Sequence, residues 1–153
     1  MEQVEEVLYS YRSLKRASKR LRRRAYTIND GMKSNYKAAD VIPGRVSAVA
    51  YSESLQDRNV VDHENLIERA KRVDELARTI KEDVEELKHD DPETGEEMIK
   101  IIKLRYFKMY SNNKIEIELA ISDRTLYRRR TQALELLKEK GLHLFYGEIM
   151  SMV

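Results

Sequence analysis

The feature that most constrains the fold is an unbroken alternation of apolar residues, four and three positions apart, between residues 66 and 87. A repeat of this kind gathers its side chains on one stripe of an α-helix, and that stripe must be buried against another helix. We therefore expect a long helix over about 62–88, packed as a hairpin within the chain or as a coiled coil with a second copy. The stripe consists of Leu66, Ala70, Val73, Ala77, Ile80, Val84 and Leu87.

A weaker stripe with the same spacing predicts a second long helix over about 2–26. It runs through Val4, Val7, Tyr11, Leu14, Ser18, Leu21 and Ala25, and Ser18 interrupts its apolar character. The acidic residues of this segment precede the basic ones, which is the order that the helix dipole favours. The basic part holds more charge than helix stability requires, so we take it as a set of candidate phosphate contacts, beside the alternative of a solvated helix end. The candidates are Lys19, Arg20, Arg22, Arg23 and Arg24.

The composition favours an all-α protein. Only five glycines and two prolines interrupt 153 residues, and 41% of the residues are hydrophobic while 37% are charged. This balance suits elongated helices around a modest core. The chain has no cysteine, which excludes disulfides and thiolate zinc sites and suggests an intracellular protein. We find no leader peptide and no apolar run long enough for a membrane span, so no membrane contact is expected.

Turn signals divide the chain into three expected segments. Residues 1–61 would hold the basic helix and a linker, with turns at 27–31 and 42–44. Residues 62–91 would hold the long heptad helix, which ends before Pro92. Residues 92–153 would begin with a third helix over 93–110. They would then hold a DNA-binding domain, a helix end at Gly141 and an apolar tail that folds back or contacts another subunit.

Charge is distributed unevenly along these segments. Residues 12–24 carry eight basic and no acidic groups, residues 53–97 seven basic and sixteen acidic, and residues 100–140 eleven basic and five acidic. A polyanion would therefore contact the two ends of the chain. The acidic middle would serve as a spacer, hold a homodimer together or meet a protein partner such as RNA polymerase.

Residues 115–137 combine a short helix, a turn with Ser122 at the helix-capping position and a second helix rich in arginine. Helical geometry places Leu126, Ala133 and Leu137 on one face of the second helix, which should be buried. The opposite side holds Arg124, Arg128 and Thr131, with Thr125, Tyr127 and Gln132 at its edges. This pattern is typical of a helix-turn-helix motif whose second helix enters the major groove of duplex DNA, and the alternative is a solvated charged face.

Roles follow from the side-chain chemistry of the helix-turn-helix. Long side chains with paired donors suit base edges, and short or cationic ones suit phosphates. Ala120 lies where this turn often has glycine. A left-handed backbone costs alanine about 1 kcal/mol or more, so we expect a turn of a different shape. Predicted base contacts are Arg124, Arg128 and Gln132, predicted phosphate contacts are Lys114, Thr125, Tyr127, Arg129 and Arg130, and Ser122 and Thr131 complete the DNA-binding set.

The residues that enzymes use are poorly arranged for catalysis in this sequence. His63, His89 and His143 are far apart, there is no glycine-rich phosphate loop, and the paired carboxylates are adjacent, so they diverge on a helix. We therefore expect neither an enzyme nor a metal or cofactor site.

The order of these parts resembles a known family. A segment beginning at YSES (51–54), the heptad helix, EEMIKIIKLRYF (96–107) and LAISDRTLYRRRTQAL (119–134) are similar to the ArpU/RinA-type late-gene transcriptional activators of phages from Gram-positive bacteria. The C-terminal part of that family is similar to region four of bacterial sigma factors. The resemblance covers about residues 50–140. It implies a sequence-specific regulator of transcription, more an activator than a repressor, that binds double-stranded DNA in the cytoplasm of a bacterial host.

Two other classes of protein share parts of this pattern. A small terminase subunit of a phage DNA-packaging machine also joins a helix-turn-helix to a helical oligomerisation segment. A helical adaptor between proteins would have the same long helices and no contact with DNA.

Overall fold

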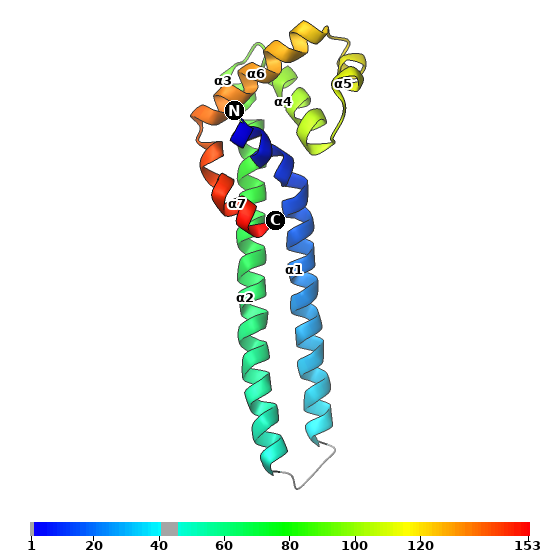
Figure 1. The fold of residues 1–153 in the computed structure, drawn as a ribbon, viewed down its shortest axis with the longest axis vertical. Coiled ribbons are helices and arrows are strands. Elements are labelled where there is room, and N and C mark those ends of the chain that lie inside the picture. The colour runs from blue at the N-terminus through cyan, green and yellow to red at the C-terminus, as the bar shows by residue number, and fades with distance from the viewer. Residues whose placement is uncertain (1, 41–45) are drawn as a thin grey trace. The chain divides into compact units, whose positions relative to one another are not determined.

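The computed structural model describes the backbone of residues 2–40 and 46–153, and the side chains of residues 2–28 and 58–153. Over these residues all regular secondary structure is helical, which confirms the expected all-α class. The elements are α1 (Glu2–Asp40), α2 (Val46–Glu85), α3 (Leu87–Asp90), α4 (Gly95–Ile102), the π-helix η1 (Lys103–Phe107), α5 (Asn112–Leu119), α6 (Asp123–Glu139), the 3-10 helix η2 (Leu142–Phe145) and α7 (Tyr146–Met152) (Figure 1).

The two long helices extend well beyond their predicted ends. Helix α1 continues through the turn signal at 27–31 to Asp40, and α2 begins at Val46 instead of near residue 62. The prediction of a linker over 27–61 is therefore wrong for the helical residues of this range. A single glycine inside a helix costs only about 1 kcal/mol, and good helix formers follow Gly31. The predicted turn at 42–44 lies outside the described residues.

The chain forms two compact units, and each long helix contributes to both. One unit comprises residues 1–15 and 75–153, and the other comprises residues 16–74. This division differs from the predicted segments 1–61, 62–91 and 92–153, whose independence as domains stays a prediction.

In the unit formed by residues 16–74, α1 and α2 contact each other within one chain. The guanidinium of Arg22 lies 2.5 Å from the Asp74 carboxylate, and Nδ1 of His63 lies 2.9 Å from the Ala25 carbonyl oxygen. Stripe residues of both helices, such as Val73, are buried in this unit. The hairpin alternative therefore accounts for these stripe residues, and pairing with a second copy stays a prediction.

In the other unit, the first turns of α1 pack against η1. The buried Tyr106 donates a hydrogen bond from its hydroxyl to Oε1 of Glu5 at 2.7 Å. The ring of Tyr9 meets Tyr106 edge-on, with centroids 4.7 Å apart, and Tyr11 stacks on Phe107 at 4.2 Å. These aromatic contacts join two segments that are about a hundred positions apart in the sequence.

The predicted helix over 93–110 is present in part, because helical structure runs from Gly95 to Phe107 but changes type and is shorter at both ends. Helix α4 begins at Gly95, becomes the π-helix η1 at Lys103, and helical structure ends before Met109, which has a φ of 60°. The wider π-turn carries Leu104 and Tyr106, and both are buried. A π-turn inside a helix allows such local repacking, which the apolar pattern alone does not reveal.

The C-terminal tail folds back, as expected. Gly141 takes a φ of 86° directly after α6, which confirms the predicted helix end. Leu142 and Ile149 are then fully buried. Lys140, at the end of α6, donates to Glu86 and Asp90, each at 2.9 Å, and so ties this helix to the end of α2 and to α3.

Gly95 and Gly147 form a matched pair for testing the packing of α3 on α4. A Cβ at Gly95 would lie 2.3 Å from the Leu87 carbonyl oxygen, whereas a Cβ at Gly147 would meet nothing within 4 Å. We expect Gly95→Ala to lower the free energy of unfolding by about 1–3 kcal/mol or more, because backbone must move. Gly147→Ala should raise it by about 0.5–1 kcal/mol, since alanine favours helix. Urea unfolding measures both, and equal effects would contradict the close approach at Gly95.

Tyr106 should make the stability of the protein depend on alkaline pH. Burial, together with the Glu5 carboxylate, raises the pKa of Tyr106 well above its usual value. The folded state then holds the phenol proton more tightly than the unfolded state does. This contribution is complete below about pH 10, the ordinary tyrosine pKa, and is lost as the pH rises above it.

We expect Tyr106→Phe to lower the free energy of unfolding at neutral pH by about 1–3 kcal/mol, because Glu5 loses its donor. Above about pH 10 the variant should lose less stability per pH unit than the unmodified protein. Urea unfolding at several pH values measures this, with Tyr127→Phe at an exposed position as the control. Parallel pH profiles would contradict the assignment.

Candidate nucleic-acid interface

A small apolar cluster holds α5 and α6 on the end of α4 and η1. Its buried members are Ile101, Leu104, Ile115 and Leu126, one from each of these four elements. Tyr110, Leu119 and Ile121 pack around them. Because Leu126 lies in the second turn of α6, the cluster fixes the direction in which the first turns of this helix face.

The connection between α5 and α6 is short and well capped. The Ser122 side chain accepts a hydrogen bond from the Thr125 backbone N–H at 3.1 Å, so the predicted helix cap is confirmed. Ala120 has φ 52° and ψ 46°, and the next N–H, of Ile121, donates to the Glu116 carbonyl at 3.1 Å. The expectation that alanine would force a different turn is wrong. Packing of the flanking apolar residues holds Ala120 in a left-handed conformation that costs about 1–2 kcal/mol.

One side of α6 is buried and the other is open to solvent. Leu126, Ala133 and Leu137 are all buried, as the helical spacing predicted. On the other side Arg124 and Arg128 are exposed, and no ion pair to either guanidinium occurs among the described side chains. The Tyr127 ring lies between these arginines in sequence and is 64% exposed. The N-terminal half of α6 therefore presents two free guanidinium groups beside an aromatic ring.

Two of the predicted DNA contacts instead have partners inside the protein. Gln132 donates to Oδ2 of Asp91 at 2.9 Å, and Arg129, whose side chain is only 21% exposed, lies 3.6 Å from Glu97. Asp91 lies in the segment that leads into α4 and Glu97 lies in the first turn of α4 itself, so both partners are next to this edge of α6. Both side chains are thus engaged within the protein, and their roles as a base contact and a phosphate contact stay predictions. Sequence spacing placed Gln132 at an edge of the exposed face but could not show that Asp91 and Glu97 lie against Gln132 and Arg129.

The remaining predicted residues lie near the open side of α6. Thr125, Arg130 and Thr131 are half-buried, and the Arg130 guanidinium lies 6.0 Å from the centre of the Tyr127 ring. Lys114, in the first turn of α5, is exposed and lies 3.8 Å over the Tyr110 ring. These residues stay candidates for phosphate contact.

An acidic pair lies beside the cap of α6. Desolvation, with a hydrogen bond and charge from Asp123, raises the pKa of Glu116 above its usual value. The hydrogen bond between Glu116 and Asp123, seven positions apart, could not be predicted from the sequence. Their negative charge would oppose a phosphate at this end of α6, so phosphate contacts should lie farther along the helix or on α5.

The basic candidates of α1 belong to the other compact unit and divide into two kinds. Lys19, Arg20, Arg23 and Arg24 are exposed. Arg22 instead pairs with Asp74, so it is less available to a phosphate than the other four, and its role as a phosphate contact stays a prediction. Partial burial alone would raise the pKa of Asp74. Hydrogen bonds from Ser18 and Arg22 outweigh this effect and hold the pKa of Asp74 below its usual value.

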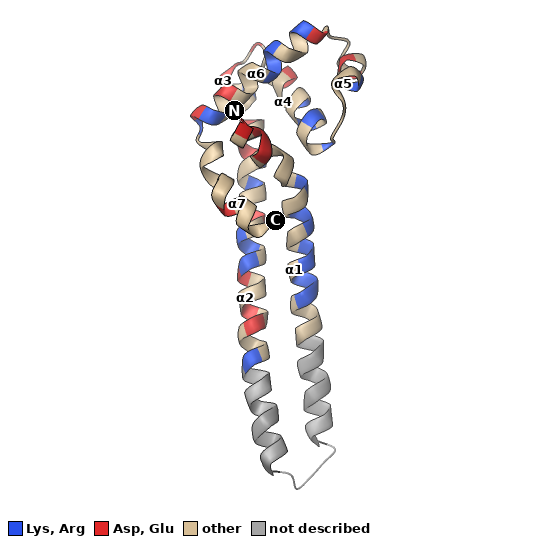
Figure 2. Ribbon diagram, in the orientation of Figure 1, with Lys and Arg blue, Asp and Glu red and all other residues tan. Residues whose placement is uncertain are grey.

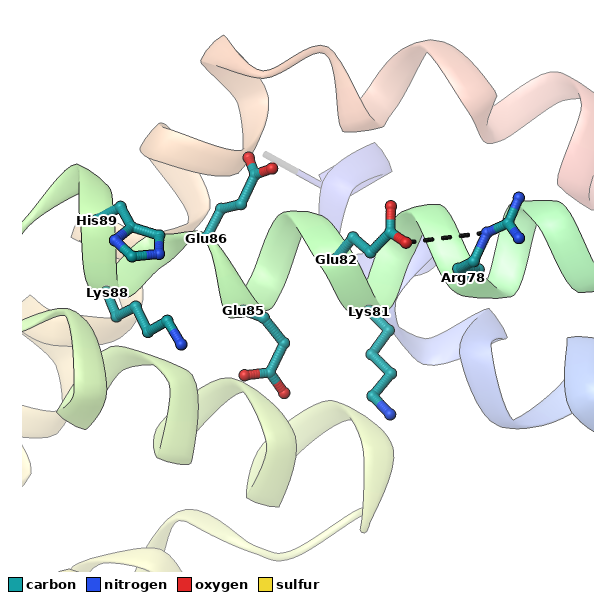
Figure 3. Close-up of a pocket in the computed structure, with 7 residues that line it drawn as sticks. All are labelled: Arg78, Lys81, Glu82, Glu85, Glu86, Lys88 and His89. Carbon is teal, nitrogen blue, oxygen red and sulfur yellow. Dashed lines mark ion pairs between the residues drawn. The ribbon is translucent and has the colours of Figure 1, made fainter.

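A hollow of about 430 Å³ lies along α2 and α3, and Figure 3 shows the side chains that line it. Acidic and basic side chains share its lining, and Arg78 lies 3.8 Å from Glu82 of the same helix. Glu85 is engaged by Lys103, which leaves it less available to a ligand. The lining residues are Arg78, Lys81, Glu82, Glu85, Glu86, Lys88 and His89.

Within the part of the chain that the structure describes, no three His, Asp or Glu side chains gather as a metal site would require. No helix of the same part has the length and apolar content needed to cross a lipid bilayer. Comparison with models of protein families, with curated proteins and with solved structures gave no match.

Ala120 offers a direct test of the turn between α5 and α6. Glycine adopts a left-handed backbone without steric cost, so Ala120→Gly should raise the free energy of unfolding by about 0.5–1 kcal/mol after the entropy of the unfolded chain is included. Ala120→Val should lower it by more than 1 kcal/mol or so, because β-branched residues are strained at positive φ. Thermal unfolding compares the pair. A more stable valine variant would disprove the left-handed turn.

Proposed function

We propose that this chain is a sequence-specific regulator of transcription that binds double-stranded DNA, with residues 112–139 as a helix-turn-helix and α6 as its recognition helix. The observation that carries the proposal is the exposed, unpaired pair Arg124 and Arg128 in the first half of a helix whose other face is fixed in the core. A helix held in this way can enter the major groove with its N-terminal residues at the base edges.

The chemistry of this face suits base recognition. Arginine pairs in a bidentate manner with the O6 and N7 atoms of guanine, the commonest specific contact in the major groove. We therefore retain Arg124 and Arg128 as base contacts and leave out Gln132, which is bonded to Asp91. Tyr127, Arg130 and Lys114 serve as contacts to the flanking phosphates, which set the register of the helix on the duplex.

The biological role that we propose, activation of phage late genes, rests on the resemblance to the ArpU/RinA-type activators. One part of this resemblance, LRYF (104–107), is explained by packing, and any protein with the same local fold would need similar residues there. Leu104 joins the apolar cluster, Arg105 donates to the Tyr110 carbonyl at 3.2 Å and Tyr106 packs on α1. The solvent-facing acidic groups of α2 would contact RNA polymerase or help to hold a homodimer together.

Removal of one guanidinium should weaken binding and relax specificity. We expect Arg128→Ala to cost about 1–3 kcal/mol of binding free energy on the preferred site and to lower the preference for that site over random duplex. Arg124→Ala should act in the same way at a neighbouring base pair. The preferred site is first selected from phage and host genomic fragments with purified protein, and fluorescence anisotropy then measures each affinity.

Lys138→Ala is the matched control, because it removes one exposed positive charge from the same helix, ten residues or about 15 Å from Arg128. Its effect should be small and equal on all sequences. Unchanged affinity and selectivity in the Arg128 variant would overturn the assignment of α6. A mass measurement that finds a ring of many subunits would favour DNA packaging over transcription.

A further inference from the structure

A second positively charged surface lies on α1, within the unit of residues 16–74. Arg16, Lys19, Arg20 and Arg23 are spaced by three, one and three positions, so they share one face of the helix. All four side chains are exposed, and Figure 2 shows the basic residues along this part of α1. We call these four residues the α1 basic stripe.

The packing of α1 leaves the stripe exposed to solvent, whereas another basic residue of the same helix, Arg22, is paired within the protein. Ala17, Ser18 and Ala25 are buried on the opposite side of the helix. Arg22 lies toward α2 and is neutralised by Asp74. None of the four stripe residues forms an ion pair with the described side chains, and the sequence has no acidic residue between Glu6 and Asp30. Four like charges held on one face without neutralisation repel one another, so a polyanion would stabilise them.

We propose that the α1 basic stripe binds the phosphate backbone of duplex DNA without regard to sequence, as a site separate from α6. Three of its four residues are arginines, whose planar guanidinium binds phosphate oxygens in a bidentate manner. The stripe extends over eight residues, or about 10 Å of helix, which corresponds to about three phosphates of one strand at 3.4 Å of duplex axis each. Tyr26, three positions beyond Arg23 and 62% exposed, adds a hydroxyl donor at the end of the stripe.

A lipid surface fits this part of α1 less well. A helix that lies on a membrane inserts an exposed apolar face between the lipids. Here the apolar side of the helix is buried against α2, and among the described side chains of residues 16–28 Tyr26 is the only large exposed apolar group. The stripe offers charge and hydrogen-bond donors alone, which are the groups that contact a phosphate backbone.

The salt dependence of binding tests the proposal. The full-length chain and its variant Arg16→Gln/Lys19→Gln/Arg20→Gln/Arg23→Gln are titrated with a labelled duplex of random sequence at several salt concentrations, and affinity is measured by anisotropy. Each phosphate contact contributes about 0.9 to the slope of log affinity against log salt. We expect the slope of the variant to be smaller in magnitude by about 3–4, and its affinity for random duplex to fall by at least about tenfold.

Two adjacent arginines give a matched pair of single variants. Arg23→Gln should reduce the slope by about 0.9, whereas Arg22→Gln should leave it nearly unchanged, because Arg22 is already paired with Asp74. Circular dichroism checks that both variants remain folded. Equal slopes for the two variants would overturn the proposal, as would an unmodified protein that does not bind random duplex.

The remaining outcomes separate this proposal from neighbouring ones. Loss of binding to phosphatidylserine vesicles in the fourfold variant, with an unchanged slope on DNA, would overturn the proposal and indicate a membrane partner. The unmodified protein could show no preference for any sequence while the fourfold stripe variant still reduces the slope. This result would support the α1 basic stripe as a phosphate-binding site and would overturn the proposal that α6 is a recognition helix. If Arg128→Ala relaxes selectivity and the fourfold stripe variant leaves the slope unchanged, the proposal for α6 is supported and the proposal for the α1 basic stripe is overturned.

Discussion

The candidate interface depends on the burial of one side of α6 against Ile101, Leu104 and Ile115. This contact is apolar and has no charge of its own, yet it determines which arginines meet solvent. Because Leu126 is held in the cluster, Arg124 and Arg128 are turned away from the protein body. Without this anchor the arginines of this segment would be an unoriented run of charge. Base recognition requires donors at fixed positions, and here the fixed positions are provided by hydrophobic packing rather than by the polar residues themselves.

The periodic features of the fold were predictable, and the local irregularities were not. Heptad spacing located many of the buried residues of both long helices, although Leu21 and Leu66 are only half-buried. The single Ser122 predicted the start of α6, and both signals depend on neighbours within about one turn. The π-turn at Lys103, the left-handed Ala120 and the continuation of α1 beyond Gly31 each have a local cost of about 1–3 kcal/mol. Tertiary packing can offset such a cost, and a single sequence does not reveal that packing.

The same distinction applies to the candidate interface. Arg124 and Arg128 were placed correctly on the exposed face because helical geometry alone decides it. The internal partners of Gln132 and Arg22 could not be predicted, because Asp91 and Asp74 lie 41 and 52 positions away from them in the sequence. A sequence pattern counts charges, whereas a structure shows which of them are already neutralised. On both α1 and α6, a basic cluster separates into residues that bind within the protein and residues that remain available.

The contact between Glu5 and Tyr106 also bears on how the chain is made. These residues are 101 positions apart, so a ribosome that adds about 5–20 residues per second needs about 5–20 s to supply the second after the first. During that interval Glu5 lacks the hydroxyl donor of Tyr106, and Tyr9 lacks its ring contact with the same residue. The start of α1 therefore completes its packing only after Tyr106 has been synthesised, and in that interval a chaperone can bind it.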